Sequence, residues 1–197
     1  MTNNEFPKKY NPESFEEKLY KNWEDNGVFK PRESTTGEQF YIPMPPPNVT
    51  SKLHIGHSSM LTLEDIMTRY HRMKGDATLL LPGTDHAGIS TQVKVEEKLA
   101  KEGKNKHNIS REEFLDECWD WTKNYGGQIQ NQFRKMGTSC DWSKEKFTMD
   151  DDMNEKVNKA FVDLYNKGLI YKGEYMVNYD PVLDTVVYIP SVTFETY

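Results

Sequence analysis

Residues 39–57 read QFYIPMPPPNVTSKLHIGH. The run from Gln39 to Met44 predicts a short β-strand, and the prolines at 45–47 end it, because proline cannot donate to a sheet ladder and holds the chain extended. A helical pattern of apolar residues follows over about 56–73, and Gly75 is a typical helix stop. The stretch therefore predicts a strand, a stiff connection and a helix in succession.

A second strand and a second helix follow directly. Residues 77–81 read ATLLL, a continuous apolar run of the kind found in buried parallel strands, and Pro82-Gly83 ends it. The next helix is expected over about 86–101. Its expected inner residues are Ile89, Val93 and Leu99. The order strand, helix, strand, helix predicts an α/β fold that begins a doubly wound parallel sheet with flanking helices.

The rest of the chain is expected to be mostly helical, with a strand-rich end. One helix starts at Asn11 and Pro12 and ends before Gly27, and a long amphipathic helix over 111–136 opens with a capping box of Ser110 and Glu113. Another helix is predicted over 150–167, with strands at 169–171, 175–178 and 186–194. The residues expected to face the core from these helices and from the helix at 56–73 are Phe15, Leu19, Trp23, Met60, Ile66, Met67, Tyr70, Met73, Phe114, Cys118, Trp121, Tyr125, Ile129, Phe133, Met136, Met153, Val157, Ala160, Phe161 and Leu164.

Composition and charge limit the class of protein. The 197 residues carry 25 Lys and Arg against 31 Asp and Glu, a net charge of −6, which argues against a general nucleic-acid coat. No apolar run approaches the roughly 18 residues of a membrane-spanning helix, and the first residues lack an apolar signal core. Two cysteines, Cys118 and Cys140, are too few for a four-cysteine zinc site or a disulfide scaffold. We therefore expect a cytoplasmic enzyme, or part of one, without a membrane partner.

Two histidines, His54 and His57, open the helix that follows the first strand. In open α/β sheets, ligands bind at the carboxyl ends of strands, and a helix N-terminus there offers N–H groups and a partial positive charge to a phosphate. The imidazoles add donors to the same anion, and Gly56 leaves room for a flat ligand. The arrangement favours phosphoryl chemistry in which charge develops on an α-phosphate. A purely structural role for the pair is the alternative.

A second candidate segment, GTDHAG at 83–88, follows the second strand. Its glycines permit tight turns, and Asp85 at the carboxyl edge of the sheet is placed to bind an ammonium group. The alternative is that Thr84 or Asp85 only caps the following helix, a common role for these residue types.

Together these segments resemble the class I aminoacyl-tRNA synthetases, and among them the valine-specific members. The pattern HIGH at 54–57 belongs to the class as a whole, whereas the longer string at 45–57 and GTDHAGISTQ at 83–92 are similar to the valine-specific form. Further segments that match in the same way are GTSCDWS at 137–143, FTMD at 147–150, KGLIY at 167–171 and VNYDP at 177–181. The resemblance extends over about residues 10–185.

The resemblance implies an ATP-dependent ligase that converts valine to valyl-adenylate and passes the valyl group to tRNA(Val). It implies that the catalytic residues are His54 and His57, and that the ATP-binding residues are Asn48, His54, Gly56 and His57. The implied valine and adenylate residues are Pro46, Asn48, Thr84, Asp85 and His86, with Asp85 on the α-ammonium group. Mg²⁺ is expected to accompany ATP and to be held more by its phosphates than by protein, so no residue is assigned to a metal.

The same resemblance implies three parts: an N-terminal helix and loop at 1–37, the first half of a Rossmann-like nucleotide-binding catalytic domain at 38–168, and the strand-rich start of a connective or editing insertion at 169–197. The chain departs from the family pattern at Ser51, in place of glycine, at Tyr179, in place of tryptophan, and around Tyr188-Ile189-Pro190. The sequence has no Lys-Met-Ser-Lys-Ser loop, so a missing C-terminal half is an expected partner.

Two interpretations of the sequence stay open. The first is the N-terminal part of a valine–tRNA ligase. The second is a truncated paralogue that binds valine and ATP, or docks on another protein, without charging tRNA. A different nucleotidyltransferase with the same histidine pattern would not explain the segment at 83–92.

Overall fold

The computed structural model describes residues 9–33, 37–174, 176–182 and 184–187. The chain divides into two compact units, with the boundary between Asn154 and Glu155, and each unit is described by itself. Tyr175, Tyr188-Ile189-Pro190 and the part of the predicted last strand beyond Val187 lie outside the described residues.

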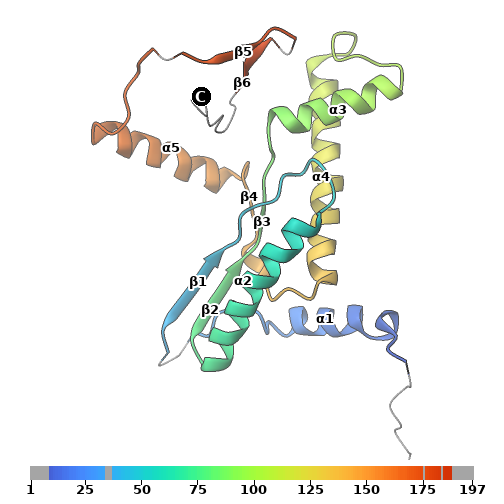
Figure 1. The fold of residues 1–197 in the computed structure, drawn as a ribbon, viewed down its shortest axis with the longest axis vertical. Helices are drawn as coiled ribbons and strands as arrows, with labels where there is room; N and C mark the ends of the chain where they lie inside the picture. Colours follow the sequence, from blue (N-terminus) through green and yellow to red (C-terminus); the bar gives the residue numbers. More distant parts are fainter. Residues whose placement is uncertain (1–8, 34–36, 175, 183, 188–197) are drawn as a thin grey trace, which may run out of the picture. The chain divides into compact units, whose positions relative to one another are not determined.

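The first unit is built around a parallel βαβ motif (Figure 1). Strands β1 (Gln39–Pro43) and β2 (Ala77–Leu81) pair in parallel, with Gln39 opposite Ala77 and Pro43 opposite Leu81. Helix α2 (Ile55–Lys74) connects them, and Gly75 ends it in left-handed backbone with φ 96°. The first strand, the helix and the second strand are therefore found where the sequence predicts them.

A second parallel pair continues the arrangement. After β2 and Pro82 comes the short strand β3 (Gly83–Thr84). It pairs in parallel with β4 (Lys146–Phe147). Position 83 requires glycine, because a Cβ there would lie 2.8 Å from the carbonyl oxygen of Lys146. Extended segments from three separate parts of the sequence thus run in parallel.

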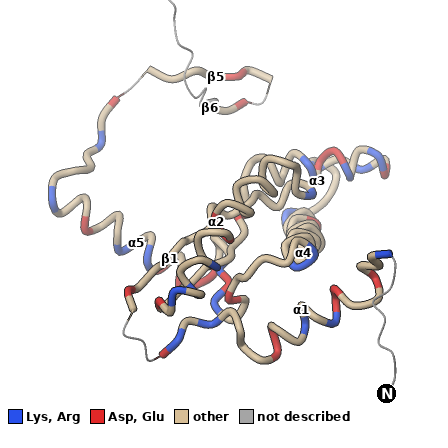
Figure 2. Tube along the Cα trace, turned by 60° about the horizontal axis from the view of Figure 1, so that its bottom comes forward, with Lys and Arg blue, Asp and Glu red and all other residues tan. Residues whose placement is uncertain are grey.

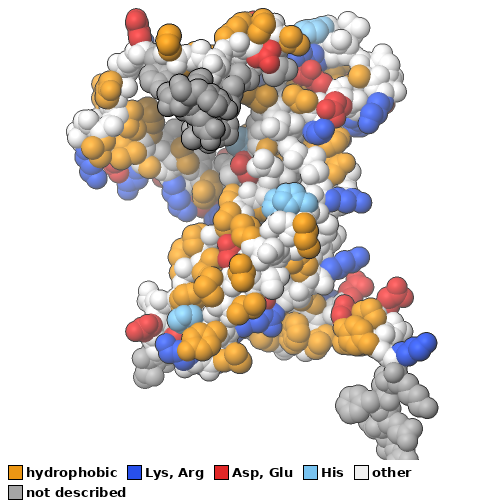
Figure 3. All heavy atoms as spheres, viewed as in Figure 1, with side chains coloured by type: hydrophobic (Ala, Val, Ile, Leu, Met, Phe, Trp, Pro, Cys, Tyr) orange, Lys and Arg blue, Asp and Glu red, His pale blue; other side chains and the backbone are white. Residues whose placement is uncertain are grey.

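Helix α2 turns a partly polar face toward the interior, contrary to the prediction. Its buried residues are Leu61, Asp65 and Thr68, Met60 is half-buried, and Ile66, Met67, Tyr70 and Met73 are exposed. The cause is hydrogen bonding to the loop at 137–139: Asp65 accepts from Ser139 N at 2.8 Å and Oγ at 2.5 Å, and Arg69 donates to Gly137 O at 2.5 Å. These bonds select the inner face and leave the apolar residues outside, where Figure 3 shows hydrophobic side chains over α2.

Helix α4 (Arg111–Lys135) is the long amphipathic helix that the sequence predicts. The Ser110 hydroxyl caps it by accepting from Glu113 N at 3.1 Å. The predicted apolar stripe is confirmed at Ile129 and Phe133, which are fully buried, whereas Met136 is exposed and Cys118 only half-buried. One core cluster joins α4 to α2 and the strands, and it contains Met44, Val49, Leu61, Leu80, Ile129, Phe133 and Cys140.

Helices α1 (Glu16–Asp25) and α3 (Ile89–Lys101) bury partly different residues from those predicted, although the prediction is confirmed at Leu99. The helix α1 begins after a 3₁₀ turn at Pro12–Ser14 and buries Tyr20, with Phe15 and Leu19 exposed. The helix α3 buries Thr91, Val95 and Leu99, with Ile89 and Val93 exposed. Both helices contact α4, and this packing buries Tyr20, Thr91 and Val95, which lie one or two residues from the predicted positions.

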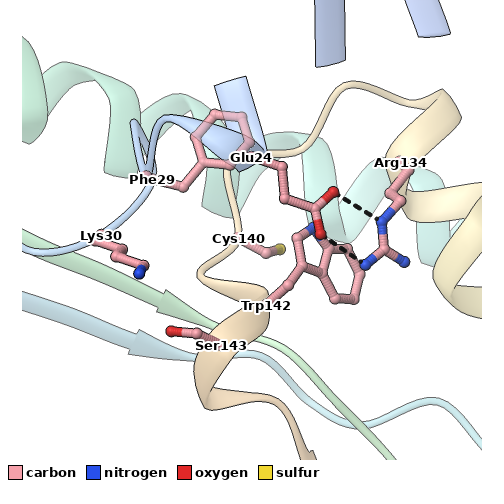
Figure 4. A pocket seen from close by; sticks show the side chains of 8 residues that line it. Glu24, Phe29, Lys30, Arg134, Cys140, Trp142 and Ser143 are labelled. Atoms are coloured by element: carbon pink, nitrogen blue, oxygen red, sulfur yellow. Dashed lines mark hydrogen bonds and ion pairs between the residues drawn. The ribbon is translucent and has the colours of Figure 1, made fainter. Parts of the chain in front are cut away.

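A charged and aromatic cluster fastens α1 to α4 (Figure 4). Arg134 donates to both carboxylate oxygens of Glu24, at 3.1 and 3.0 Å, and its guanidinium carbon lies 4.1 Å from the ring centroid of Trp142. The Trp142 indole N–H donates to the Tyr20 hydroxyl at 2.7 Å, which donates to Thr138 O. The cluster borders a cavity of about 330 Å³. Because these groups already bond to one another, we assign the cavity to packing.

Charged residues of both signs are interspersed along α3, the loop after it and α4, and Figure 2 marks their positions along the trace. Three ion pairs connect them: Lys98–Glu117 at 2.6 Å, Lys104–Glu113 at 3.7 Å and Lys106–Glu96 at 2.9 Å. The pairing balances the charge of this surface.

The second unit is small. Helix α5 (Asp151–Asn166) crosses the boundary and has no buried residue in the described structure, so the predicted inner positions Val157, Phe161 and Leu164 are exposed. Strands β5 (Asn178–Asp180) and β6 (Thr185–Val187) form an antiparallel hairpin, whereas the predicted strand at 169–171 does not form. A single helix and a two-stranded hairpin offer too little surface to bury an amphipathic face.

Candidate functional site

The candidate site lies where the extended segments after β1 and β3 meet. Val49 N donates to Asp85 O at 2.9 Å and Asp85 N donates to Pro47 O at 2.8 Å, which pairs Asn48 with Asp85 in parallel. Pro46 lies beside Gly83, since a Cβ on Gly83 would be 3.7 Å from Pro46 Cβ. The backbone therefore brings the exposed residues Pro46 and Asn48 to the edge that carries Asp85.

His54 and His57 cap the N-terminus of α2 reciprocally. Nδ1 of His54 accepts from Gly56 N at 3.1 Å, and Nδ1 of His57 accepts from His54 N at 3.2 Å. The two rings stack with centroids 3.8 Å apart. A Cβ on Gly56 would lie 2.9 Å from His54 Cε1, so glycine is needed here to keep the His54 ring in place. The structural role that the sequence left open is thus present.

The cap also fixes what the two rings can offer to a ligand. A neutral imidazole whose Nδ1 accepts a hydrogen bond carries its proton on Nε2. Each ring therefore presents an Nε2–H donor at a helix N-terminus, where an anion is favoured. Partial burial, and in second place the neighbouring His54, lower the pKa of His57 below its usual value of 6.5. His57 is therefore a neutral donor at pH 7.

A pH titration of His57 followed by NMR checks this electrostatic environment. We expect a His57 pKa below 6.5. We expect His54→Gln to raise this pKa only part of the way back to 6.5, because burial is the larger cause of the shift. Between the two pKa values the folded chain binds fewer protons than the unfolded chain, so this residue lowers stability as the pH falls through 6.5. A His57 pKa at or above 6.5 in the unaltered chain would contradict the structure.

Asp85 sits in a tight loop between β3 and α3. Its Oδ1 accepts from Ala87 N at 3.0 Å and from the Thr148 hydroxyl at 3.2 Å, and lies 3.3 Å from His86 Nδ1. Ala87 and Gly88 adopt left-handed backbone, with φ 54° and 45°. The helix α3 starts after Gly88 without a side-chain cap, so Asp85 closes the loop rather than capping the helix.

Two side chains of α4 bond to the backbone of residues 49–53, the segment that connects Asn48 to the histidine pair. Trp121 Nε1 donates to Val49 O at 3.0 Å, and Gln132 Oε1 accepts from Leu53 N at 2.9 Å. Sequence reasoning assigned Trp121 to the core and gave Gln132 no role, because nothing in a helical stripe marks a side chain that bonds to a distant backbone.

Thr84, which directly precedes Asp85, differs from the other predicted site residues in its surroundings. It is buried and lines a cavity of about 270 Å³, whose other lining residues are Val49, Thr122, Lys123, Gly126, Gly127, Gln130, Glu145, Phe147 and Asp150. Gln130 donates to Glu145 at 2.6 Å, and burial raises the pKa of Glu145. None of the other predicted site residues lines this cavity.

The structure thus brings the predicted residues together in two groups. Pro46, Asn48, Asp85 and His86 lie on paired strand ends, and His54, Gly56 and His57 lie at the start of α2. Among the described residues, no hydrogen bond joins the histidine pair to Asp85. Thr148 was not selected from the sequence, although its hydroxyl contacts Asp85 and His86 and it stands in the segment at 147–150 that resembles the family.

Within the described part of the chain, no group of three or more His, Cys, Asp or Glu side chains could hold a metal ion. None of the described helices has the length and apolar character needed to cross a bilayer.

Comparison with known proteins gives consistent matches. The model of the family "tRNA synthetases class I (I, L, M and V)" matches residues 18–190. The chloroplastic/mitochondrial valine–tRNA ligase 2 of Arabidopsis thaliana is 56% identical over 174 residues, 88% of this chain and 18% of that protein. The valine–tRNA ligase of Caulobacter vibrioides is 49% identical over 181 residues, 91% of this chain and 20% of that protein.

A solved structure shares the fold. The LeuRS of Agrobacterium radiobacter K84, solved in a ternary complex with tRNA and LeuAMS, superposes with a TM-score of 0.72 over 91% of this chain and 21% of that one, at 24% identity. The chain spans about a fifth of the length of the relatives it matches. By the family model, which covers most of its length, the chain belongs to the class I tRNA synthetases of the I, L, M and V group.

Proposed function

We propose that this chain carries the part of a valine–tRNA ligase active site that binds valine and the phosphates of ATP. The observation that carries the proposal is the pairing of Asn48 with Asp85 on adjacent strand ends, with the histidine cap of α2 six residues further along the chain. Relatives at 49–56% identity that are named valine–tRNA ligases support valine as the amino acid.

The proposed reaction needs positioning and charge stabilisation rather than a nucleophilic side chain. A carboxylate oxygen of valine attacks the α-phosphorus of ATP, the bond from that phosphorus to the bridging oxygen breaks, and pyrophosphate leaves. In the complete enzyme, a hydroxyl of the 3′-terminal adenosine of tRNA(Val) then attacks the valyl carbonyl and AMP leaves.

Each group of the site has a part in this step. The Nε2–H donors of His54 and His57 stabilise the negative charge that grows on the phosphate oxygens. Asp85 accepts the α-ammonium of valine through Oδ2, and Pro46, Asn48 and His86 border the amino acid and the adenylate. We place Thr84 behind this site, in the cavity beside α4. Mg²⁺ would neutralise phosphate charge when bound with ATP.

With this function we propose the same three parts of the chain as the sequence analysis: an N-terminal helix and loop at 1–37, the first half of the catalytic domain at 38–168, and the start of an insertion at 169–197. In it, the parallel strands belong to the first half of a nucleotide-binding sheet and the β5–β6 hairpin belongs to the start of the insertion. The second candidate function is a binding module that holds valine or ATP without charging tRNA.

Valine-dependent exchange of pyrophosphate into ATP, measured on the purified chain beside valine and ATP binding, separates the two candidates. Exchange that His57→Ala removes supports the ligase site. Binding without exchange supports the binding module. Absence of both in a folded chain contradicts both.

A further inference from the structure

Thr148 lies at a junction that the proposed chemistry leaves unexplained. It follows β4 directly, and its N–H donates to Thr84 O at 3.2 Å, so the backbone holds it next to the end of β3. Its half-buried side chain reaches the loop that carries Asp85 and His86.

The Thr148 hydroxyl makes three polar contacts with two adjacent residues. It donates to Asp85 Oδ1 at 3.2 Å, accepts from His86 N at 3.0 Å, and lies 2.6 Å from His86 Nδ1. A hydroxyl has one donor and two lone pairs. The arrangement that satisfies all three contacts gives the proton of Thr148 to Asp85 and uses Nδ1–H of His86 as the second donor to the hydroxyl. One side chain therefore sets both the direction of the carboxylate and the tautomer of the imidazole.

The loop at 85–88 has a backbone conformation that needs stabilising contacts of this kind. Ala87 is not a glycine, yet it has φ 54°, and Gly88 follows with φ 45° and ψ −109°. Left-handed backbone at a residue with a Cβ persists only where its surroundings hold it. The Ala87 N–H and the Thr148 hydroxyl both occupy Oδ1 of Asp85. Among the described residues, no hydrogen bond reaches Oδ2, which is left for a ligand.

We propose that Thr148 is a positioning residue for amino acid binding. Its hydroxyl fixes the Asp85 carboxylate so that Oδ2 meets the α-ammonium of the substrate, and it holds His86 beside it. This inference rests on the proposed function, because the ammonium group is the one Asp85 is proposed to bind.

The test compares Thr148→Val, which keeps the shape and removes the hydroxyl, with Thr148→Ser, which keeps the hydroxyl. Valine and ATP affinities of the full chain are measured by calorimetry, and folding is checked by circular dichroism. We expect Thr148→Val to weaken valine about tenfold or more, as for loss of a hydrogen bond to a charged group. Thr148→Ser is expected to stay within about threefold of the unaltered chain, and ATP affinity to stay unchanged in both variants.

The other outcomes are distinguishable. Valine affinity that is unaltered in Thr148→Val overturns the positioning role and leaves the proposed function standing. An equal loss of valine and ATP affinity overturns it as well, because it shows a general structural role. If Thr148→Val does not fold, Thr148→Ala replaces it in the same comparison. If the unaltered folded chain binds no valine, the proposed function fails first, before any variant is measured.

Discussion

Asp85→Asn is expected to weaken valine binding about a hundredfold or more while leaving the fold intact. The substitution keeps Oδ1 as an acceptor for Ala87 N and the Thr148 hydroxyl, so the loop retains its ties. It replaces the proposed ligand atom Oδ2 by an amide and removes the negative charge. Truncating one partner of a hydrogen-bonded charge pair costs about 2–5 kcal/mol, which is the basis for this magnitude.

Calorimetry with two ligands isolates the ammonium contact. The unaltered chain is expected to prefer valine over 3-methylbutanoate, which lacks the amino group, and Asp85→Asn is expected to lose most of that preference. ATP affinity serves as the internal control, since the histidine pair is untouched. An Asn variant that still separates the two ligands as the unaltered chain does would remove Asp85 from the site.

Asp65→Ala is expected to destabilise the first unit by about 3–5 kcal/mol, as for breaking a buried charged hydrogen-bond network. Asp65 is 9% exposed and accepts from Ser139 N, Ser139 Oγ and Arg69 Nε, the last at 2.7 Å. Alanine would leave the donors of buried Ser139 without a partner and leave a void beneath α2. Because the loop at 137–139 precedes β4 and Thr148, the loss is also expected to weaken the ligand site.

Urea unfolding followed by tryptophan fluorescence measures this effect, since all four tryptophans precede residue 155. Asp25→Ala is the matched control. Asp25 pairs with Lys21 on an exposed helix face, with 58% of its side chain accessible, and such pairs contribute at most about 1 kcal/mol. Equal stability losses in the two variants would show that the network around Asp65 does not hold α2 in place.

Asp65 also shows what sequence reasoning could not find. The strands at 39–43 and 77–81, the helix between them and the glycine stop all follow from local chemistry, and each is found close to its predicted position. The inner face of α2 does not follow from it. Apolar periodicity pointed to Ile66, Met67 and Tyr70, whereas the face that packs inward carries a carboxylate bound to a loop more than seventy residues later.

The candidate site also contains residues that the sequence selects and residues that only the folded structure reveals. His54, His57 and Asp85 stand in motifs directly after strands, so position along the chain is enough to select them. Thr148 and Gln132 act through hydrogen bonds to residues 62 and 79 positions away, and such contacts exist only once the strands and α4 are packed. Thr84 stands in the same motif as Asp85, and it differs from the other predicted site residues in being buried and lining the cavity beside α4.

Binding of a non-hydrolysable valyl-adenylate analogue, the valyl sulfamoyl adenosine, tests the central claim most directly. It presents the ammonium group, the side chain and a phosphate mimic together, so it engages Asp85 and the histidine pair at once. The account predicts saturable one-to-one binding by the purified chain, weakened by both Asp85→Asn and His57→Ala. A folded chain that gives no saturable binding of this analogue, or whose binding is indifferent to both substitutions, would contradict it.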